Sequence, residues 1–405
     1  MGRIKSLKCR ECSTEYEPTL KYVCDECFGP LDVIYDYDAI NLTKDKLNIR
    51  SRNLWRYFEL LPILNPLNII DLTVGFTPLI KCEKLGKILG LNQLYIKNDT
   101  LNPTYSFKDR PASVGVSKAL ELGISSVGCA STGNLAAATS ACAAKGGLKC
   151  YVFIPSGIER AKIVQASAYG AYVIEVDGDY DDVNRLASQA ADLFNLGIVN
   201  INLRPYYVEG SKTLAFEIAE QLNWDVPDHI IIPIGSGALL HSICKGFEEL
   251  ERIGLINEFY TKITGAQPEG CSPVVKAFKN GNEEIIPIEH PDTIAKSLAI
   301  GEPGDGLYAL RKIKKQNGYA ESARDLDILE AIQLLAKSEG IFAEPAGGIT
   351  IAVLKRLVEQ GKISKDEKVV CCVTGSGLKS LEIISTPILK TIKPDIELLA
   401  KVIGV

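Results

Sequence analysis

The stretch 231-IIPIGSGALLHSICKG-246 combines an uncharged, Ile-rich run, a glycine-containing loop and the start of a helical pattern. The same order of strand, loop and helix recurs along the chain. Uncharged runs at 125–130 (SSVGCA), 150–155 (CYVFIP) and 369–374 (VVCCVT, after Lys368) are each followed by a segment that we expect to be helical. Such alternation is typical of parallel sheets covered by helices on both faces, so the predicted fold class is α/β. In that architecture ligands bind at the carboxyl ends of the strands.

The loop Gly235-Ser236-Gly237-Ala238 lies at one such strand end. Its backbone N–H groups and the positive end of the next helix dipole would point at one place, as in an anion-binding loop. The Gly-Lys-Ser/Thr end of a P-loop is missing, and Leu240 replaces the third glycine of a dinucleotide fingerprint, so neither nucleotide motif fits. The alternative is a tight turn whose small residues only let the helix pack on the sheet.

The composition is that of a folded globular protein, since hydrophobic residues make up 46% and charged residues 23% of the 405 residues. A chain of this length is expected to form roughly two to three domains. The formal net charge of −5 and the scattered Lys and Arg residues argue against nucleic acid as a partner. No apolar run reaches the ~18 residues that span a bilayer, and the start MGRIKSLKCR lacks the apolar region of a signal peptide. We therefore expect a cytoplasmic protein without a membrane partner.

Four of the cysteines form two pairs near the N-terminus, Cys9-x-x-Cys12 and Cys24-x-x-Cys27. This spacing is close to that of a zinc ribbon, in which each pair supplies two thiolates to one tetrahedral ion. Because residues 1–36 could bury little core, a metal would stabilise them in its place. We therefore predict these four cysteines as ligands of a structural zinc ion. The alternative is a small β-ribbon whose cysteines hold nothing.

Other loops carry polar residues whose ordinary roles are structural. Ser131-Thr132-Gly133-Asn134 precedes an alanine-rich helical pattern, in which Asn134 could simply be the N-cap. Thr374 ends a strand, where a lone threonine usually turns its hydroxyl to the backbone. Lys108 lies within 102-NPTYSFKDRPAS-113, and a lysine beside Asp and Arg is ordinarily a solvated charge. Each residue alone is weak evidence for a site, and their combination is more specific.

Five segments follow one another in an informative order: Pro103-Thr104 before Ser106-Phe107-Lys108-Asp109-Arg110, Ser131-Thr132-Gly133-Asn134, the Gly235 loop, Glu344-Pro345-Ala346 and Thr374-Gly375. In this combination the chain resembles the fold-type II pyridoxal-phosphate enzymes and, within them, the threonine synthase family. NLWRYFELLPI, VGFTPLI, EGSKTLAFEIAEQL and the N-terminal cysteines are similar to archaeal-type members. The resemblance covers nearly the whole chain between Asn53 and Lys379.

The resemblance implies a cofactor site for pyridoxal 5′-phosphate. Lys108 would condense with the cofactor's aldehyde and would later act as the base that removes the substrate's α-proton. Phe107 would pack on the ring, Asn134 would hydrogen-bond the phenolic oxygen and Thr374 would face the pyridine nitrogen. The loop of Gly235, Ser236, Gly237, Ala238 and Leu239 would hold the 5′-phosphate.

The same resemblance implies the conversion of O-phosphohomoserine and water to L-threonine and phosphate. Ser131, Thr132 and Gly133 are the expected ligands of the substrate carboxylate. The expected ligand of the substrate phosphate is Lys162, with Lys97 and Arg110 behind it.

Tyr105 and Pro111 stand where the family commonly has glycine, which leaves the substrate open. The alternatives are an O-phosphoserine-dependent β-replacement enzyme and a serine/threonine dehydratase of the same fold. A non-catalytic, ribbon-bearing binding protein is the alternative from another class.

The implied architecture is that of a fold-type II enzyme, with two doubly wound, mostly parallel α/β domains behind a small zinc-ribbon-like segment. We predict the ribbon at 1–36 and a large cofactor-binding domain made of 37–98 and 206–405. A small domain at 99–205 would carry the lysine and the Ser-Thr-Gly-Asn loop, with the cofactor between the two domains. A homodimer is the expected assembly.

Overall fold

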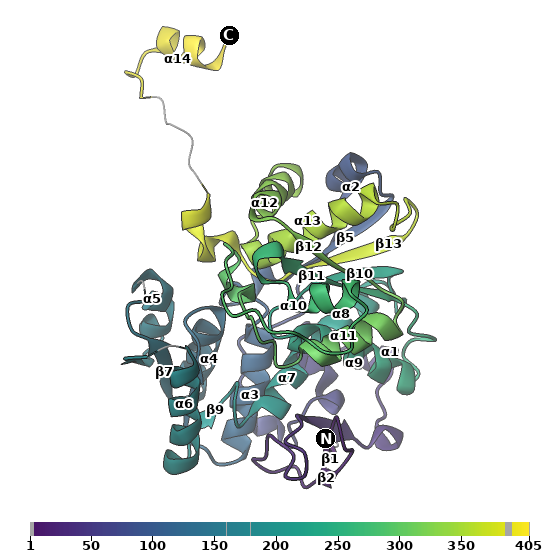
Figure 1. Cartoon of the computed structure of the whole chain (residues 1–405), viewed down its shortest axis with the longest axis vertical. Helices are drawn as coiled ribbons and strands as arrows, with labels where there is room; N and C mark the ends of the chain where they lie inside the picture. Colours follow the sequence, from purple (N-terminus) through teal and green to yellow (C-terminus); the bar gives the residue numbers. More distant parts are fainter. Residues whose placement is uncertain (1–3, 159, 179, 385–390, 405) are drawn as a thin grey trace.

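The computed structural model describes residues 4–158, 160–178, 180–384 and 391–404, and its strands form sheets of six, four and three strands (Figure 1). The six-stranded sheet has the order β12-β11-β10-β13-β5-β4. All its neighbouring strands are parallel except β4 and β5. Its strands are β4 (Leu79–Lys81), β5 (Gln93–Asn98), β10 (His229–Pro233), β11 (Lys262–Pro268), β12 (Ala320–Ala323) and β13 (Lys368–Val373).

The four-stranded sheet is parallel throughout and has the order β8-β7-β6-β9. Its strands are β6 (Ser126–Ala130), β7 (Lys149–Pro155), β8 (Tyr172–Val176) and β9 (Gly197–Ile198). The chain leaves the six-stranded sheet after β5, forms the four-stranded sheet and returns at β10. The predicted α/β class with mostly parallel sheets is therefore confirmed, and the predicted domain boundaries stay a prediction.

Helices cover both faces of the sheets. The helices of the described residues are α1 (Lys44–Asn48), α2 (Glu83–Leu89), α3 (Asp109–Glu121), α4 (Asn134–Gly146), α5 (Arg160–Ala168), α6 (Tyr180–Phe194), α7 (Arg204–Ser211), α8 (Thr213–Gln221), α9 (Ala238–Arg252), α10 (Pro273–Lys279), α11 (Gly306–Lys315), α12 (Asp325–Glu339), α13 (Pro345–Glu359) and α14 (Ile396–Ile403).

Strand β10 shows why its sequence is uncharged. Ile230 and Ile232 belong to the core under α8, α9 and α11, whereas Ile231 belongs to the core under α2, α12 and α13. Because successive strand residues point to opposite faces, a strand covered on both sides needs apolar residues at every position. In the smaller sheet, α4 and α6 likewise contact β6 and β7, and their apolar residues lie in separate cores.

The N-terminal segment is an antiparallel ribbon of order β2-β1-β3, formed by β1 (Ile4–Cys9), β2 (Glu15–Tyr16) and β3 (Leu31–Tyr35). It lies beside α7 (Figure 1). Leu7, Val33 and Tyr35 are buried in the same core as α3 and α4. The Tyr35 hydroxyl donates to Glu209 at 2.7 Å. The ribbon is thus packed onto the body of the protein.

The helix expected after β13, at 375–384, is absent. The structure has short 3₁₀ helices at Gly377–Lys379 and Leu381–Ile383 instead. Gly375 and Ser376 pair in extended form with Ser106 and Ala343, so the chain continues past the strand before it can turn.

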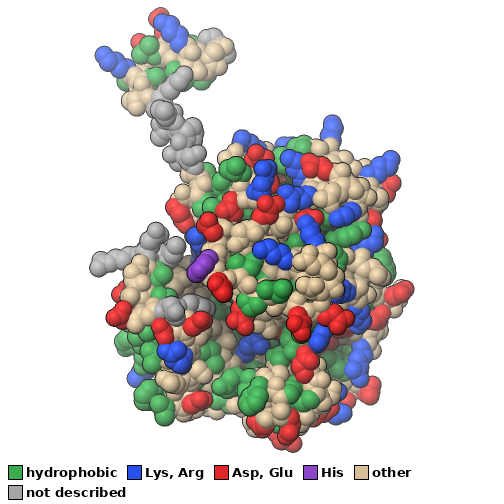
Figure 2. Space-filling view, viewed as in Figure 1, with side chains coloured by type: hydrophobic (Ala, Val, Ile, Leu, Met, Phe, Trp, Pro, Cys, Tyr) green, Lys and Arg blue, Asp and Glu red, His purple; other side chains and the backbone are tan. Residues whose placement is uncertain are grey.

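The visible surface carries mixed charge. Figure 2 shows Lys and Arg side chains interspersed with Asp and Glu over this face. None of the helices in the described residues combines the length and the apolar character that crossing a bilayer requires.

Candidate active site

The loop before α3 is held against the end of β13, and this contact positions Lys108. The Phe107 N–H donates to the Thr374 carbonyl at 2.8 Å, and the Ser376 N–H donates to the Tyr105 carbonyl at 3.0 Å. Lys108 follows directly and precedes the first residue of α3. The predicted lysine therefore lies at the carboxyl edge of the large sheet, beside the predicted Thr374.

The amine of Lys108 lies in largely apolar surroundings. Its Nζ is 4.7 Å from the centroid of the Phe107 ring and 3.3 Å from the hydroxyl of Tyr207, a residue of α7. Burial lowers the pKa of Lys108 to about 8, although the nearby Glu344 and Cys129 act in the opposite direction. An amine with this pKa is partly neutral at physiological pH, as a nucleophile or base requires.

Asn134 contacts a carboxylate from a distant part of the chain. Its Nδ2 donates to the two carboxylate oxygens of Glu344 at 3.1 and 3.0 Å. Glu344 is buried and its own N–H donates to the Gly375 carbonyl at 2.9 Å. The N-cap of α4 is Gly133, so the alternative in which Asn134 caps the helix is wrong. The start of α4 and the end of β13 thus meet near Lys108.

The glycine loop after β10 has the tight geometry that its sequence suggested. Gly237 has φ of +94°, and a Cβ there would lie 2.5 Å from the Asp305 carbonyl oxygen. A Cβ at Gly235 would lie 3.1 Å from the Ser297 carbonyl oxygen. Glycine is therefore required at 237 by its positive φ and by close backbone approach, and a side chain at 235 would be tightly packed. Ala238 begins α9, so free N–H groups of its first turn lie at this loop.

Helix α7 connects Lys108 to the glycine loop. Tyr207 contacts the Lys108 amine, and Arg204 forms an ion pair with Asp305. The Asp305 N–H in turn donates to the Ser236 carbonyl at 2.8 Å. Residues three apart on a helix share a face, about one turn from each other. The amine and the candidate anion-binding loop therefore flank the same side of α7.

The predicted carboxylate loop also lies at a strand end. Ser131 follows β6 directly, and its N–H donates to the Phe153 carbonyl at 3.2 Å. Ser131, Thr132 and Gly133 are all at least partly exposed, and a Cβ at Gly133 would meet open space. They precede the N-terminus of α4, whose dipole favours an anion.

Lys97 and Arg110 are fully buried in an ion-pair cluster. The guanidinium of Arg110 binds both oxygens of Asp99, at 2.7 and 2.9 Å, and also both oxygens of Glu217. The Lys97 amine pairs with Glu217 at 2.7 Å and donates to the Thr77 carbonyl at 2.6 Å. This placement argues against the predicted contact with the substrate phosphate, because the donors are occupied inside the protein.

The side chain of Lys162, in α5, lies outside the described part of the structure. Gln165, three residues later, accepts a hydrogen bond from Lys379. Burial lowers the pKa of Lys379, while the nearby carboxylates Asp109 and Glu344 act against this effect. A cation not predicted from the sequence thus reaches the edge of the site.

Tyr105 and Pro111 differ in how well they suit positions where glycine is common. Tyr105 has φ of +69° and is 48% exposed. Glycine adopts this left-handed conformation without cost, whereas other residues pay about 1–2 kcal/mol. Pro111 is buried in the first turn of α3, where its missing N–H would have no partner in the helix. The structure therefore explains a glycine preference at 105.

The four predicted metal ligands converge. The Sγ atoms of Cys9, Cys12, Cys24 and Cys27 all lie within 4.8 Å of one another. A Cβ at Gly29 would lie 2.9 Å from the Cys9 sulfur, so the loop passes close to the cluster. This donor set suits a tetrahedral zinc ion with a closed coordination shell.

Comparisons with known proteins agree with this geometry. Residues 70–375 match the family described as "Pyridoxal-phosphate dependent enzyme". A threonine synthase of Methanocaldococcus jannaschii is 45% identical over 92% of this chain and 92% of its own length. A threonine synthase of a Bacillus species is 40% identical over 82% of this chain and 90% of its own length.

Solved structures support the fold. The processed form of threonine deaminase isoform 2 from Solanum lycopersicum superimposes with a TM-score of 0.64 at 24% identity, over 82% of this chain and 83% of its own. Diaminopropionate ammonia lyase from Escherichia coli superimposes with a TM-score of 0.65 at 18% identity, over 84% of this chain and 91% of its own. The fold is that of a fold-type II enzyme, and the chain belongs to the threonine synthase family of pyridoxal-phosphate-dependent enzymes.

Proposed function

We propose that this protein converts O-phosphohomoserine and water to L-threonine and phosphate at the site around Lys108. As a member of its family the chain is a pyridoxal-phosphate-dependent lyase. The observation that carries the proposal is the placement of the Lys108 amine on the same side of α7 as a glycine loop that opens α9. When bound, pyridoxal phosphate supplies an aldehyde that condenses with amines and a ring that withdraws electrons from the bond being broken.

The residues present fit this cofactor. Lys108 offers an amine that can attack the aldehyde and, once released, accept the substrate's α-proton. The segment from Gly235 to Leu239 offers backbone N–H groups and the helix dipole to the 5′-phosphate. The glycines keep this cradle open, because a Cβ at 235 or 237 would push against neighbouring backbone. Phe107 supplies an apolar wall.

Two further residues would orient the cofactor ring. Asn134 would donate one of its two N–H groups to the phenolic oxygen, while the other would stay with Glu344 and hold the amide in place. Thr374 would offer its hydroxyl to the pyridine nitrogen. A hydroxyl can donate a hydrogen bond without protonating the ring, unlike an aspartate. Thr374 would thereby leave the cofactor a weaker electron acceptor than an aspartate would, which would suit elimination of the γ-phosphate.

The substrate needs two anion sites. Ser131, Thr132 and Gly133, at the N-terminus of α4, would bind its carboxylate. Lys162 remains our candidate for its phosphate, and we add Lys379, which bonds to Gln165 one helical turn from Lys162. Water would add at the β-carbon after the phosphate leaves. We also propose a homodimer, which light scattering of the purified protein would test.

A parallel assay tests the proposed function. The purified protein is incubated with O-phosphohomoserine, O-phosphoserine or threonine, and phosphate, threonine and keto acid are measured. We expect equal amounts of phosphate and threonine from O-phosphohomoserine, and no turnover by Lys108→Ala. Keto acid from threonine would identify a dehydratase, and phosphate from O-phosphoserine with an added nucleophile would identify a β-replacement enzyme. Absence of all products from cofactor-loaded protein would indicate a binding protein.

A further inference from the structure

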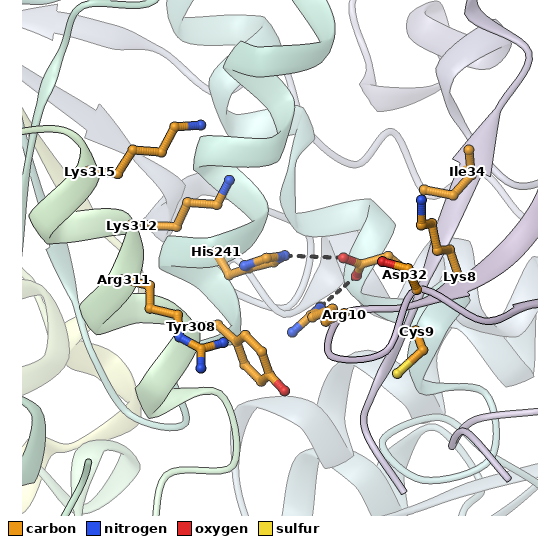
Figure 3. Close-up of a pocket in the computed structure, with 11 residues that line it drawn as sticks. Lys8, Cys9, Arg10, Asp32, Ile34, His241, Tyr308, Arg311, Lys312 and Lys315 are labelled. Atoms are coloured by element: carbon orange, nitrogen blue, oxygen red, sulfur yellow. Dashed lines mark hydrogen bonds and ion pairs between the residues drawn. The ribbon is translucent and has the colours of Figure 1, made fainter. Parts of the chain in front are cut away.

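Arg10 is one of several residues that link the cysteine ribbon to the body of the protein. Arg10 lies between Cys9 and Cys12, and its side chain is only 6% exposed. Its guanidinium binds Asp32 of β3 at 2.6 Å and Asp305, the residue before α11, also at 2.6 Å. Figure 3 shows Arg10 and His241 both pointing at Asp32, in a cavity between the ribbon and helices α9 and α11. An ion pair thus joins the ribbon to the segment before α11.

Asp305 is fully buried and both of its carboxylate oxygens are bound by arginines. Oδ1 accepts from Arg10, and Oδ2 accepts from Arg204 of α7. A buried carboxylate needs such partners, because burial of an uncompensated charge is costly. The position of Asp305 therefore depends on a residue of the ribbon.

The backbone of Asp305 forms one side of the glycine loop. Its N–H donates to the Ser236 carbonyl at 2.8 Å. Its carbonyl oxygen lies 2.5 Å from the point that a Cβ of Gly237 would occupy. A shift of Asp305 would therefore move Ser236 and Gly237, and with them the N–H groups that face the cofactor phosphate.

The other end of this link lies among the four converging cysteines. Arg10 is held between two of the converging thiols, and its N–H donates to the Pro30 carbonyl at 3.1 Å. A tetrahedral ion on the four thiolates would fix the backbone on both sides of Arg10. Without the ion this short segment has little core of its own to hold it.

We propose that Arg10 and Asp305 are positioning residues for the cofactor, through which the metal-bound ribbon holds the phosphate loop in its binding geometry. The proposal rests on the proposed function, in which the Gly235–Leu239 loop binds the 5′-phosphate. It predicts that damage to the ribbon weakens binding of the phosphate end of the cofactor and leaves binding of the aldehyde end unchanged.

The test compares the affinities of the full-length, cofactor-free protein for pyridoxal phosphate and for pyridoxal, which lacks the phosphate. Binding is followed by the visible absorbance of the product with the lysine amine. Arg10→Gln and Asp305→Asn should each raise the dissociation constant of pyridoxal phosphate by at least about tenfold, as loss of an outer-shell partner does at metal sites. The dissociation constant of pyridoxal should stay the same. Removal of the metal with a chelator should reproduce this selective loss.

Two further variants control for charge and for folding. Lys8→Gln removes a cation of β1 that is 40% exposed and pairs only distantly with Glu15, at 4.0 Å, so the affinity for pyridoxal phosphate should not change. Arg10→Lys keeps the charge and should recover part of the lost affinity. Asp305→Asn leaves all four thiols intact, so its metal content should equal that of the unmodified protein.

The outcomes separate this proposal from the proposed function. Unchanged affinity for pyridoxal phosphate in both Arg10→Gln and Asp305→Asn overturns the link, as does an equal loss for both ligands, which would reflect general damage. If the unmodified protein binds pyridoxal as tightly as pyridoxal phosphate, the assignment of the phosphate loop itself fails, whatever the variants do.

Discussion

Lys108 should react with an aldehyde at a much lower pH than an ordinary lysine does. Burial lowers its pKa from 10.5 to about 8, and only the neutral amine attacks a carbonyl. At pH 7 about 9% of an amine with a pKa of 8 is neutral, against roughly 0.03% at a pKa of 10.5, a difference of about 300-fold. The shift corresponds to about 3 kcal/mol in favour of the neutral form.

The assay follows the visible absorbance that appears when pyridoxal phosphate condenses with the cofactor-free protein. The rate should rise about tenfold per pH unit below about pH 8 and should level off above it. The rate of Lys108→Ala, measured in parallel, reports the exposed lysines and is subtracted. A midpoint near that of an exposed lysine would refute the assignment of a partly buried, reactive amine at position 108.

Glu344→Gln extends this prediction. Glu344 raises the pKa of Lys108 against the effect of burial, so its neutralisation should move the midpoint to lower pH. Glu359→Gln, an exposed change at the other end of α13, is the matched control and should leave the midpoint in place. A shift to higher pH in Glu344→Gln would contradict the proximity of the two side chains.

Three further predictions concern the buried cluster and the loop before Lys108. Arg110→Met should lower the free energy of unfolding by about 3–5 kcal/mol in urea titrations, because Asp99 and Glu217 would stay buried without their main partner. An unchanged urea midpoint would contradict the ion pairing of Arg110 with these two carboxylates. Burial opposes ionisation of Glu217, but Arg110 and Lys97 outweigh it and lower its pKa from 4.5 to about 2. The ionised Glu217 should therefore contribute about 3 kcal/mol to the free energy of unfolding, in full above about pH 4.5 and progressively less as the pH falls toward 2. In Glu217→Gln the free energy of unfolding should depend less on pH over this range. Tyr105→Gly should be more stable than Tyr105→Ala by about 1 kcal/mol in the free energy of unfolding, because alanine keeps a Cβ at a positive φ. It should therefore also unfold at a higher temperature. Equal stability of the two variants would mean that the loop carries no backbone strain at this residue.

The sequence predicted those parts of the site that depend on local signals. The glycine loop lies between an uncharged strand and a helix, and the structure confirms the strand end, the turn and the helix start. The close approach of Asp305 that makes Gly237 necessary could not be predicted, because it depends on a partner from another part of the chain.

Residues joined by long-range contacts could not be paired from the sequence. Glu344 was visible only as part of a Glu-Pro-Ala segment, and its contact with Asn134 spans 210 positions. Tyr207 carries no local signal, because a tyrosine in an apolar helix usually belongs to the core. For Arg110, too, the sequence could not show the partners: the fold surrounds its guanidinium with Asp99 and Glu217, which argues against the predicted contact with the substrate phosphate.

The origin of the product's oxygen tests the central claim most directly. O-Phosphohomoserine is turned over by the cofactor-loaded protein in water labelled with heavy oxygen, and both products are analysed by mass spectrometry. If the γ-phosphate leaves by C–O cleavage and water adds at the β-carbon, each threonine carries one labelled oxygen in its hydroxyl and the released phosphate carries none. Label in the phosphate, with homoserine as the other product, would mean simple hydrolysis of the P–O bond and would contradict the account.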